Sequence, residues 1–366
     1  LRSLKEKITM TKICIVTGAR SNFVKVAPII RAIKKAQEEG RDVSYELVYA
    51  GSEKDPTLEP SLFEDLQMPR PDHFLGVDCV NLNELTGRVM SEFEDYLNAH
   101  PTDVVIVVDD LASTMAVAIV TKKSGITLAH LVAGTRSFDI TMPKEINRLV
   151  IDGLSDLLFT AGIASTSNAA RGGAESNRIY MVGNVLMDSL RAAHDRLKRP
   201  AIMDKLKLEA GEYLVLTLNR KALMSDKEKM KRLLTTVCEA GMPIVAPLRR
   251  DATKVVEELR LPIIPCPPLP YLEFGWLTAH AKGVITDSGN VAEEATWNQV
   301  PCITLNSYTE HIETVKQGSN VLVGEDADRL REALQQLKRG EWKPCSLPDR
   351  WDGRTAERIV QTILSY

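Results

Sequence analysis

The chain lacks both a long apolar run and a large excess of charge of either sign. No stretch approaches the roughly 18 uninterrupted apolar residues of a transmembrane helix. The 46 Lys and Arg residues nearly balance the 49 Asp and Glu residues, so the formal net charge is only −3. Such a chain has no overall field to attract nucleic acid or an anionic membrane, and we expect neither as a partner.

The cysteines also lack any pattern that would bind metal or form a disulfide framework. The six residues are scattered, with no C-x-x-C pair and no histidine close by. We therefore expect reduced thiols, no metal site and no cofactor. The N-terminal stretch LRSLKEKITMTK is charged and has no apolar segment of signal length. These features predict a cytoplasmic protein.

What the sequence does contain is an alternation of short apolar runs with helix-like segments. KICIVTGAR followed by VKVAPIIRAIKKAQEEG predicts a buried strand, a turn and an amphipathic helix, and DVVIVVDD, LASTMAVAIVTKKSG and TLAHLVAG repeat the theme. A second series, including EYLVLTLNR, MPIVAPLRR and KGVITDSG, follows Pro200. This pattern predicts the α/β class, with two doubly wound domains that face each other across a cleft.

The clearest local signal is VITDSGNVAEEATWNQVPCITL, residues 284–305. Residues 287–290 end a predicted strand and begin a predicted helix, which Ser288 can cap while free backbone N–H groups face outward. Such a helix start binds phosphate, and Glu293 and Glu294 follow it, where a carboxylate can accept hydrogen bonds from ribose hydroxyls. The same residues are also typical of an ordinary capped helix with an acidic first turn.

Two further segments are candidates for anion binding or catalysis. In TGARSNFVK, Gly18 permits close backbone approach and Arg20 and Lys25 supply positive charge. The turn matches neither G-x-G-x-x-G nor the P-loop spacing, which gives little support to dinucleotide redox chemistry or NTP hydrolysis. In LAHLVAGTRSFDITMPKEINRL, residues 128–149, a dense polar segment follows a strand-like run, and such loops hold ligands in α/β proteins.

Several segments together resemble the non-hydrolysing UDP-N-acetylglucosamine 2-epimerase family. The similar runs are VAGTRSFDITMPKEINRLVIDGLSDLLFT, VGNVLMDSL, PLPYLEFGWL, TDSGNVAEEATWNQVPCITL, TEHIETVKQGSNVLVG and RWDGRTAERIVQTIL. The resemblance implies a glycosyltransferase-B architecture with a Rossmann-like domain at 11–182 and a nucleotide-binding Rossmann-like domain at 183–352. A C-terminal helix at 353–366 would return to the first domain. It also implies a homodimer formed through the first domain.

The resemblance further implies that the chain binds UDP or a UDP-N-acetylhexosamine. Arg20 matches the diphosphate position, the 288–290 turn matches the phosphate-binding turn, and Glu294 matches the ribose-binding carboxylate, while His311 replaces a usual arginine. The nucleotide-binding candidates are Arg20, Lys25, Arg148, Ser288, Gly289, Asn290, Glu294 and His311.

The reaction positions depart from the family pattern. Family members eliminate UDP across C1 and C2 of the sugar and add it back, which needs positioned acids and bases. Asp110 keeps its carboxylate, but Val132 and Lys144 replace glutamates and Asn219 replaces a histidine. Valine cannot transfer a proton, and asparagine has no accessible pKa. Asp110 and Glu145 remain as catalytic candidates.

Two neighbouring residues have alternative interpretations. His130 is predicted to be a satisfied core histidine rather than a base. Asp109 is interpreted as a turn-capping residue, although two paired carboxylates such as Asp109 and Asp110 can raise the pKa of one of them enough to make a general acid.

We therefore expect a UDP-sugar-binding protein whose ordinary epimerase chemistry is lost or altered. One alternative is an active UDP-N-acetylglucosamine 2-epimerase, or another UDP-sugar enzyme that performs elimination or glycosyl transfer, using Asp110 with Lys144 or Glu145. The other is a non-catalytic partner that regulates an active paralogue.

Overall fold

The computed structural model describes residues 10–366; most of the charged N-terminal stretch, residues 1–9, lies outside the described part. The chain divides into two compact units, each with its own sheet and core. Unit 1 runs to Ser189 and includes Asp352–Tyr366, whereas unit 2 is Leu190–Trp351. No helix among the described residues is long and apolar enough to cross a membrane.

Unit 1 contains a seven-stranded sheet in the order β3-β2-β1-β4-β5-β6-β7, and every neighbouring pair is parallel. The strands are β1 Thr11–Thr17, β2 Val43–Tyr49, β3 His73–Phe74, β4 Val104–Val108, β5 Thr127–Ala133, β6 Leu157–Thr160 and β7 Ile179–Met181. The order of the strands reverses between β1 and β4. All five residues of β4 are buried, as expected for an inner strand of a parallel sheet with helices on both faces.

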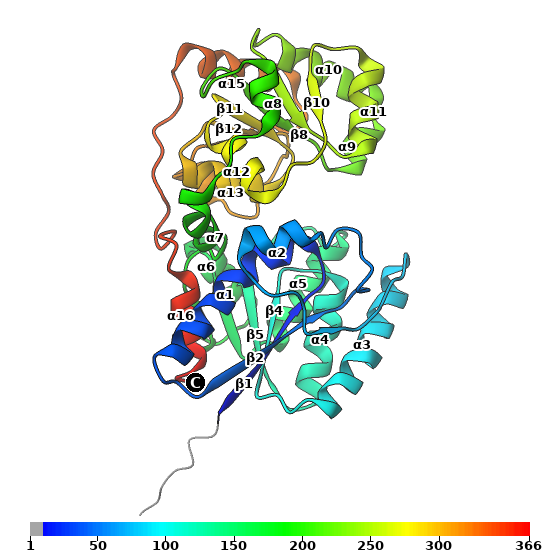
Figure 1. Cartoon of the computed structure of the whole chain (residues 1–366), viewed down its shortest axis with the longest axis vertical. Helices are drawn as coiled ribbons and strands as arrows, with labels where there is room; N and C mark the ends of the chain where they lie inside the picture. Colours follow the sequence, from blue (N-terminus) through cyan, green and yellow to red (C-terminus); the bar gives the residue numbers. More distant parts are fainter. Residues whose placement is uncertain (1–9) are drawn as a thin grey trace, which may run out of the picture. The chain divides into compact units, whose positions relative to one another are not determined.

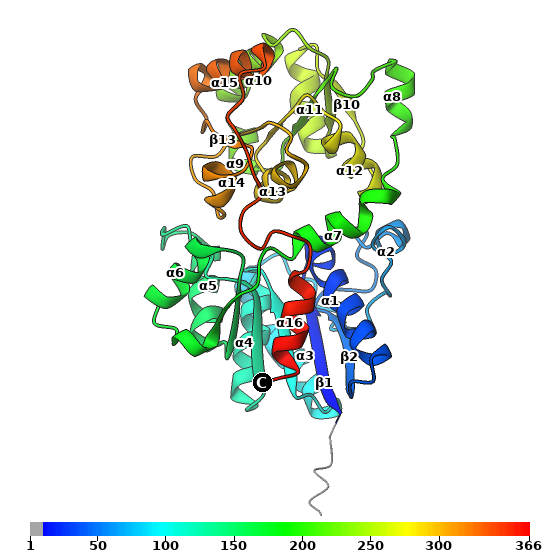
Figure 2. The same ribbon diagram turned by 90° about the vertical axis from the view of Figure 1, so that its left-hand side faces the viewer.

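The helices of unit 1 pack along this sheet (Figure 1). They are α1 Arg20–Glu38, α2 Pro60–Leu66, α3 Leu82–Ala99, α4 Ala112–Lys123, α5 Pro143–Leu154, α6 Ile163–Arg171, the first half of α7 Leu186–Ala193 and α16 Thr355–Ile363. The last of these, α16, lies beside α1 (Figures 1 and 2). Its start is held by the Asp188 carboxylate, which accepts the backbone N–H groups of Thr355 at 3.1 Å and Ala356 at 2.7 Å.

Unit 2 contains a six-stranded parallel sheet in the order β10-β9-β8-β11-β12-β13. The strands are β8 Leu214–Thr217, β9 Ile244–Pro247, β10 Ile264–Cys266, β11 Gly283–Thr286, β12 Cys302–Thr304 and β13 Asn320–Leu322. The helices are α8 Ala201–Leu206, α9 Lys221–Ser225, α10 Lys227–Cys238, α11 Arg250–Leu259, α12 Tyr271–Ala279, α13 Gly289–Asn298, α14 Glu313–Lys316 and α15 Ala327–Arg339. The strand order reverses between β8 and β11.

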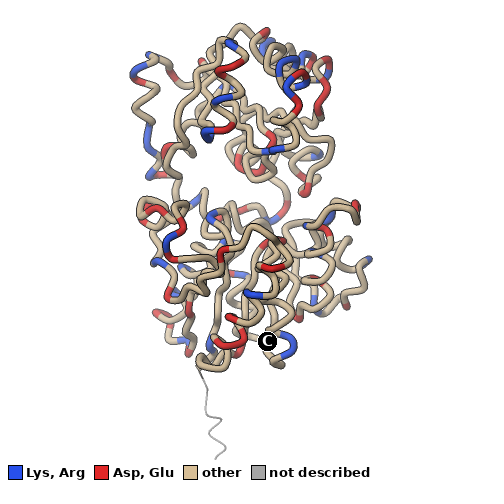
Figure 3. The backbone as a smooth tube through the Cα atoms, turned by 90° about the vertical axis from the view of Figure 1, so that its right-hand side faces the viewer, with Lys and Arg blue, Asp and Glu red and all other residues tan. Residues whose placement is uncertain are grey.

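The predicted α/β class with two doubly wound parallel sheets is confirmed. Basic and acidic residues are interspersed in both units, consistent with the small net charge (Figure 3). The boundary between the units falls inside α7, between Ser189 and Leu190. Each sheet therefore has its own reversal point, and ligands of such sheets bind at the carboxyl ends of the strands beside that point.

Candidate functional site

In unit 1 two turns lie at the point where the strand order reverses, one after β1 and one after β4. The turn after β1 is held by Asn22. The Asn22 side-chain oxygen accepts the backbone N–H groups of Gly18 at 2.9 Å and Ala19 at 3.1 Å, which fixes the turn. A side chain at Gly18 would place its Cβ 2.2 Å from the Ser113 hydroxyl, so any larger residue would force the Ser113 side chain to move. Arg20 begins α1 with a half-buried side chain, and no ion pair joins it to another described residue.

The second part of this reversal point is Asp109, which follows β4. Its carboxylate pairs with Lys25 at 2.6 Å and accepts the Asn22 amide N–H at 2.8 Å. Its backbone φ of 61° lies in the left-handed region, which aspartate tolerates better than most residues. Lys25 is buried and carries an internal counter-ion, whereas the Arg20 guanidinium has none, so Arg20 is the better candidate to contact an anion.

Asp110 is held between two cations. Arg148 contacts its Oδ2 atom at 2.8 Å through Nε and at 2.6 Å through a terminal nitrogen, and Lys144 lies 3.2 Å from Oδ1. Burial raises the pKa of Asp110, but Lys144 and Arg148 outweigh burial and lower it. The alternative in which the paired carboxylates make Asp110 a general acid is therefore contradicted: Asp110 is held as a carboxylate and is a poor proton donor.

Glu145, the other catalytic candidate, shares the same arginine. It is 3% exposed, and its Oε2 atom accepts the Ser137 backbone N–H at 2.8 Å and hydroxyl at 2.9 Å. A terminal nitrogen of Arg148 lies 3.3 Å from the same oxygen. Burial raises the pKa of Glu145, but the Ser137 hydrogen bonds and Arg148 lower it overall. The structure thus brings both candidates together around one buried guanidinium.

A third carboxylate, Asp152, organises the loop behind these residues. It contacts His130 Nδ1 at 2.7 Å and Arg136 at 2.7 Å, and accepts the Gly134 backbone N–H at 3.0 Å. The other His130 nitrogen lies 2.9 Å from the backbone oxygen of Asp109. Because both ring nitrogens have internal partners and the ring is 2% exposed, His130 is a satisfied core histidine, as predicted. Sequence reasoning missed Asp152, which lies 22 residues from His130 along the chain.

Val132 occupies an unusual backbone conformation. Its φ is 66°, and it lies where the pairing register between β5 and β6 shifts. A β-branched residue in the left-handed region is an outlier with an intrinsic cost, and such outliers concentrate at functional sites. Val132 nevertheless has no polar side-chain atom and cannot move a proton.

A cavity of about 480 Å³ opens beside the first turn of unit 1. Gly18 and Ser113 line one part of it, and residues 49–52 and 54–56 with Asp78 line another. A hydrogen bond of 2.6 Å between the Tyr49 hydroxyl and Asp55 holds part of this wall. Its volume falls within the range of small-molecule pockets.

In unit 2 the reversal point is tied together by Asp287. Its carboxylate accepts the backbone N–H of Asn219 at 2.7 Å and that of Arg220 at 2.7 Å, which links the ends of β8 and β11. The hydroxyls of Thr217 and Thr286 add a 2.6 Å hydrogen bond between the same strands. Asn219 thus lies beside the 287–290 turn.

The start of α13 corrects one prediction. Ser288 is at the N-cap position, but its side chain makes no capping hydrogen bond, so the expected cap is absent. Its backbone N–H instead donates to the Thr286 hydroxyl at 3.0 Å. Gly289 has open space where a Cβ would lie, and residues 288–290 are half-buried. The start of α13 is therefore accessible, and the Ser288 hydroxyl does not accept a hydrogen bond from the first backbone N–H groups of the helix.

One turn further, Glu294 is a buried carboxyl group to which no described residue donates a hydrogen bond. It is 8% exposed, and burial, followed by repulsion from Glu293, raises its pKa to about 8. His311 lies 3.6 Å from Glu293 through Nε2, and its ring meets Trp351 edge-on with centroids 6.0 Å apart. A buried polar group that lacks an internal partner calls for an explanation, and a ligand donor is one.

Comparisons with known proteins agree with the resemblance seen in the sequence. A family model described as UDP-N-acetylglucosamine 2-epimerase matches residues 34–364. The UDP-N-acetylglucosamine 2-epimerase of Methanocaldococcus jannaschii is 33% identical over 374 residues, covering 97% of this chain and 99% of the relative. The UDP-2,3-diacetamido-2,3-dideoxy-D-glucuronate 2-epimerase of Pseudomonas aeruginosa is 33% identical over 331 residues, covering 88% of this chain and 91% of the relative.

Solved structures share the fold. The crystal structure of Methanocaldococcus jannaschii UDP-GlcNAc 2-epimerase in complex with UDP-GlcNAc and UDP has a TM-score of 0.83 and 31% identity, covering 97% of this chain and all of that one. The Neisseria meningitidis UDP-GlcNAc 2-epimerase bound to UDP-GlcNAc, at 22% identity, has a TM-score of 0.85 and covers 97% of this chain and 100% of that chain. The glycosyltransferase-B type of fold is thus confirmed. The chain belongs to the UDP-N-acetylglucosamine 2-epimerase family.

Proposed function

We propose that this family member binds a UDP-sugar but does not carry out the ordinary 2-epimerase reaction. Similar proteins have solved structures with UDP-GlcNAc and UDP, which supports nucleotide-sugar binding here. One observation carries the second half of the proposal: the four carboxylates of the cluster beside β4 and β5, those of Asp109, Asp110, Glu145 and Asp152, are each engaged in an ion pair. None of them is placed to exchange protons with a substrate without breaking that pair.

We assign the phosphate and ribose contacts in unit 2 to the start of α13. Gly289 and Asn290 offer backbone N–H groups to which no described residue is bonded, and Ser288 adds a hydroxyl that makes no capping hydrogen bond, at a helix N-terminus where phosphate is favoured. Glu294 has no internal hydrogen-bond donor, and ribose hydroxyls would supply donors. In unit 1 we assign an anion contact to Arg20, because no acidic residue among 10–366 forms an ion pair with its guanidinium.

The loss of the reaction follows from the residues at the family's acid–base positions. By the resemblance, Val132, Lys144 and Asn219 replace two glutamates and a histidine, and none of the three restores the missing group. Asp110 keeps its carboxylate, but it is paired with Arg148 and has a lowered pKa. Loss of one acid–base group costs about 10²–10⁴ in rate, so three losses should remove most of the reaction.

Incubation with UDP-N-acetylglucosamine in D₂O, followed by NMR of the sugar C2 position, tests the proposal. We expect no deuterium at C2, no UDP-N-acetylmannosamine and no released UDP, while calorimetry shows that UDP binds. The double variant Ser288→Ala with Glu294→Ala should lose UDP binding. Deuterium exchange at C2 by the unmodified chain would overturn the loss of chemistry, and unchanged UDP affinity in the double variant would overturn the assigned nucleotide contacts.

Restoration of the family residues gives a positive control. Val132→Glu, Lys144→Glu and Asn219→His together should recover some exchange at C2, because Asp110 is still present. Each single change should do little, since acid, base and orienting groups act as a unit. Measured by calorimetry, Arg20→Ala should weaken binding of the UDP-sugar more than binding of uridine, because a guanidinium pairs with phosphate oxygens. Equal weakening of both ligands would indicate a folding defect instead.

A second candidate function is favoured by the contact between Lys144 and Asp110. Their charged atoms lie 3.2 Å apart, and the Lys144 side chain is 58% exposed, so a substrate can reach the pair. This candidate is an enzyme that acts on a UDP-sugar by elimination or transfer through Asp110, Lys144 or Glu145. Release of UDP from the substrate without exchange at C2 would favour this enzyme. Tight binding of UDP with no UDP release and no exchange at C2 would favour a non-catalytic partner.

A further inference from the structure

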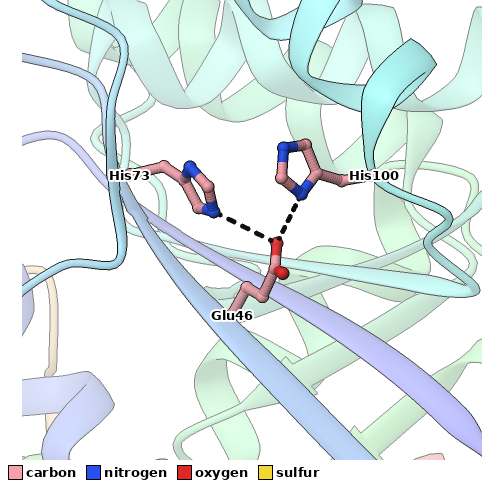
Figure 4. Close-up of side chains that lie close together, drawn as sticks. All are labelled: Glu46, His73 and His100. Atoms are coloured by element: carbon pink, nitrogen blue, oxygen red, sulfur yellow. Dashed lines mark ion pairs between the residues drawn. The ribbon is translucent and has the colours of Figure 1, made fainter.

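Among residues 10–366, one group of three side chains converges in the manner of metal ligands: Glu46, His73 and His100. Figure 4 shows both imidazole rings directed at the Glu46 carboxylate. His100 Nδ1 lies 3.1 Å from Glu46 Oε2, and His73 Nε2 lies 3.6 Å from the same oxygen. All three ligand atoms lie within 4.8 Å of one another.

These separations fit a small divalent cation. Two ligands bound tetrahedrally to zinc at its usual bond lengths lie about 3.3 Å apart. The side chains of Glu46, His73 and His100 are 44%, 35% and 31% exposed, so water can complete the coordination and small rotamer adjustments are possible. Two imidazole nitrogens with one carboxylate form a donor set typical of Zn²⁺ and other divalent transition metals, and unlike the all-oxygen sets of Mg²⁺ or Ca²⁺.

Neighbouring residues hold the ligands in place. The Tyr96 hydroxyl donates to Glu46 Oε2 at 2.5 Å, and the Tyr96 ring stacks on His100 with centroids 4.4 Å apart. A carboxylate oxygen has a second lone pair for a metal, so this hydrogen bond can remain as an outer-shell contact.

The cluster is separate from the nucleotide-binding candidates. His100 directly follows α3 and precedes β4, whereas Asp109 and Asp110 follow β4 at its carboxyl end. Glu46 lies in the middle of β2, and His73 begins β3. The cluster therefore belongs to β2, β3 and the end of α3, and none of its residues lies in the turns that follow β1 and β4.

We propose that Glu46, His73 and His100 form a binding site for a divalent transition metal, with Zn²⁺ as the best-fitting ion. The expectation of no metal rested on the spacing of cysteines, and this site uses none. Bound metal would join β2, the two-residue edge strand β3 and the end of α3. Its role would be structural: it would hold the short edge strand against the sheet and reduce its fraying.

Titration of the metal-depleted full chain with Zn²⁺ in a calorimeter tests the site. We expect one equivalent to bind and to raise the unfolding temperature, because the folded chain binds the metal and the unfolded chain does so poorly. Glu46→Gln, which keeps the shape and an acceptor for Tyr96, and His73→Ala should each weaken binding by at least ~100-fold. Tyr96→Phe removes only an outer-shell contact and should weaken binding by about 10-fold.

The matched control is His194→Ala, which removes an exposed histidine outside the cluster and should leave binding unchanged. Substitution of Co²⁺ adds a spectroscopic readout of the ligands: visible d–d bands without a thiolate charge-transfer band are expected from nitrogen and oxygen donors. Absence of a saturable equivalent, equal binding in wild type and Glu46→Gln, or a thiolate band would each overturn the site. Far-UV circular dichroism shows whether each variant is folded. If His73→Ala does not fold, Glu46→Gln still tests the site.

Discussion

The buried Glu294 makes a specific prediction about the pH dependence of unit 2. Burial and the neighbouring Glu293 raise its pKa from 4.5 to about 8. In the unfolded chain the group ionises near its ordinary value, so between these two values the folded state holds a proton that the unfolded state has released. Raising the pH across this window must therefore lower the stability of unit 2. The loss is complete once the pH exceeds the folded pKa.

The size of the effect follows from proton linkage. While the folded state binds one proton more than the unfolded state, the free energy of unfolding falls by about 1.4 kcal/mol per pH unit. Glu294→Gln replaces the group with a neutral isostere and removes this term. Because the folded state is already half ionised at pH 8, the stability of the variant minus that of wild type should rise by about 2 kcal/mol between pH 6 and pH 8 and level off above about pH 9.

Tryptophan fluorescence isolates the relevant unit. All four tryptophans, Trp276, Trp297, Trp342 and Trp351, lie in unit 2. Urea unfolding followed by this signal at several pH values reports the free energy of unfolding of unit 2 without interference from unit 1.

The exposed Glu332 of α15 supplies a matched control, since Glu332→Gln removes a glutamate of the same unit that is not buried. Its stability difference from wild type should not change over the same pH range. A Glu294→Gln difference that is equally flat would refute the reasoning, because it would mean that Glu294 ionises alike in the folded and unfolded states.

Three further predictions concern the buried charges and the tight loop of unit 1. The stability of each variant is measured by far-UV circular dichroism and by limited proteolysis. Asp152→Asn removes the charge shared by two buried partners and should lower the free energy of unfolding by about 3–5 kcal/mol. Arg148→Ala should cost a similar amount, because it removes the buried cation from Glu145 and leaves Asp110 with the exposed Lys144, whereas Lys144→Ala should cost at most about 1 kcal/mol because that side chain is 58% exposed; the reverse order would contradict the assignment. Gly134→Ala should disrupt the loop, since φ is 74° and the new methyl group would lie 2.0 Å from a backbone oxygen; wild-type protease resistance would contradict this.

The fold was predictable because its determinants are local. Each strand of the two sheets is a short apolar run, and the runs alternate with amphipathic segments, so periodicity alone indicated βαβ units. The candidate residues at strand ends were predictable for the same reason. Asp110 is the second residue after β4 and Ser288 is the second residue after β11, and a polar residue at that point of a parallel sheet is a candidate whatever its partners are.

Partners were not predictable, because they come from distant parts of the chain. Lys25 and Asp109 are 84 residues apart, and Asp110 and Arg148 are 38 apart. No periodicity or spacing rule links such pairs in a single sequence. The metal-type cluster was missed for the same reason: it joins a strand, the start of an edge strand and the residue after a helix, each of them unremarkable on its own.

The partners that the sequence did not reveal decide whether Asp110 can transfer a proton. A carboxylate at a strand end is a proton donor, a base or a structural anion according to what surrounds it, and the sequence alone left all three open for Asp110. Arg148 lies within 2.6 Å of Asp110 and 3.3 Å of Glu145, so one buried guanidinium opposes protonation of both. Any variant designed to recover catalysis must therefore do more than replace Val132: it must also change the charge balance around Arg148, which Lys144→Glu does by removing a second cation from Asp110.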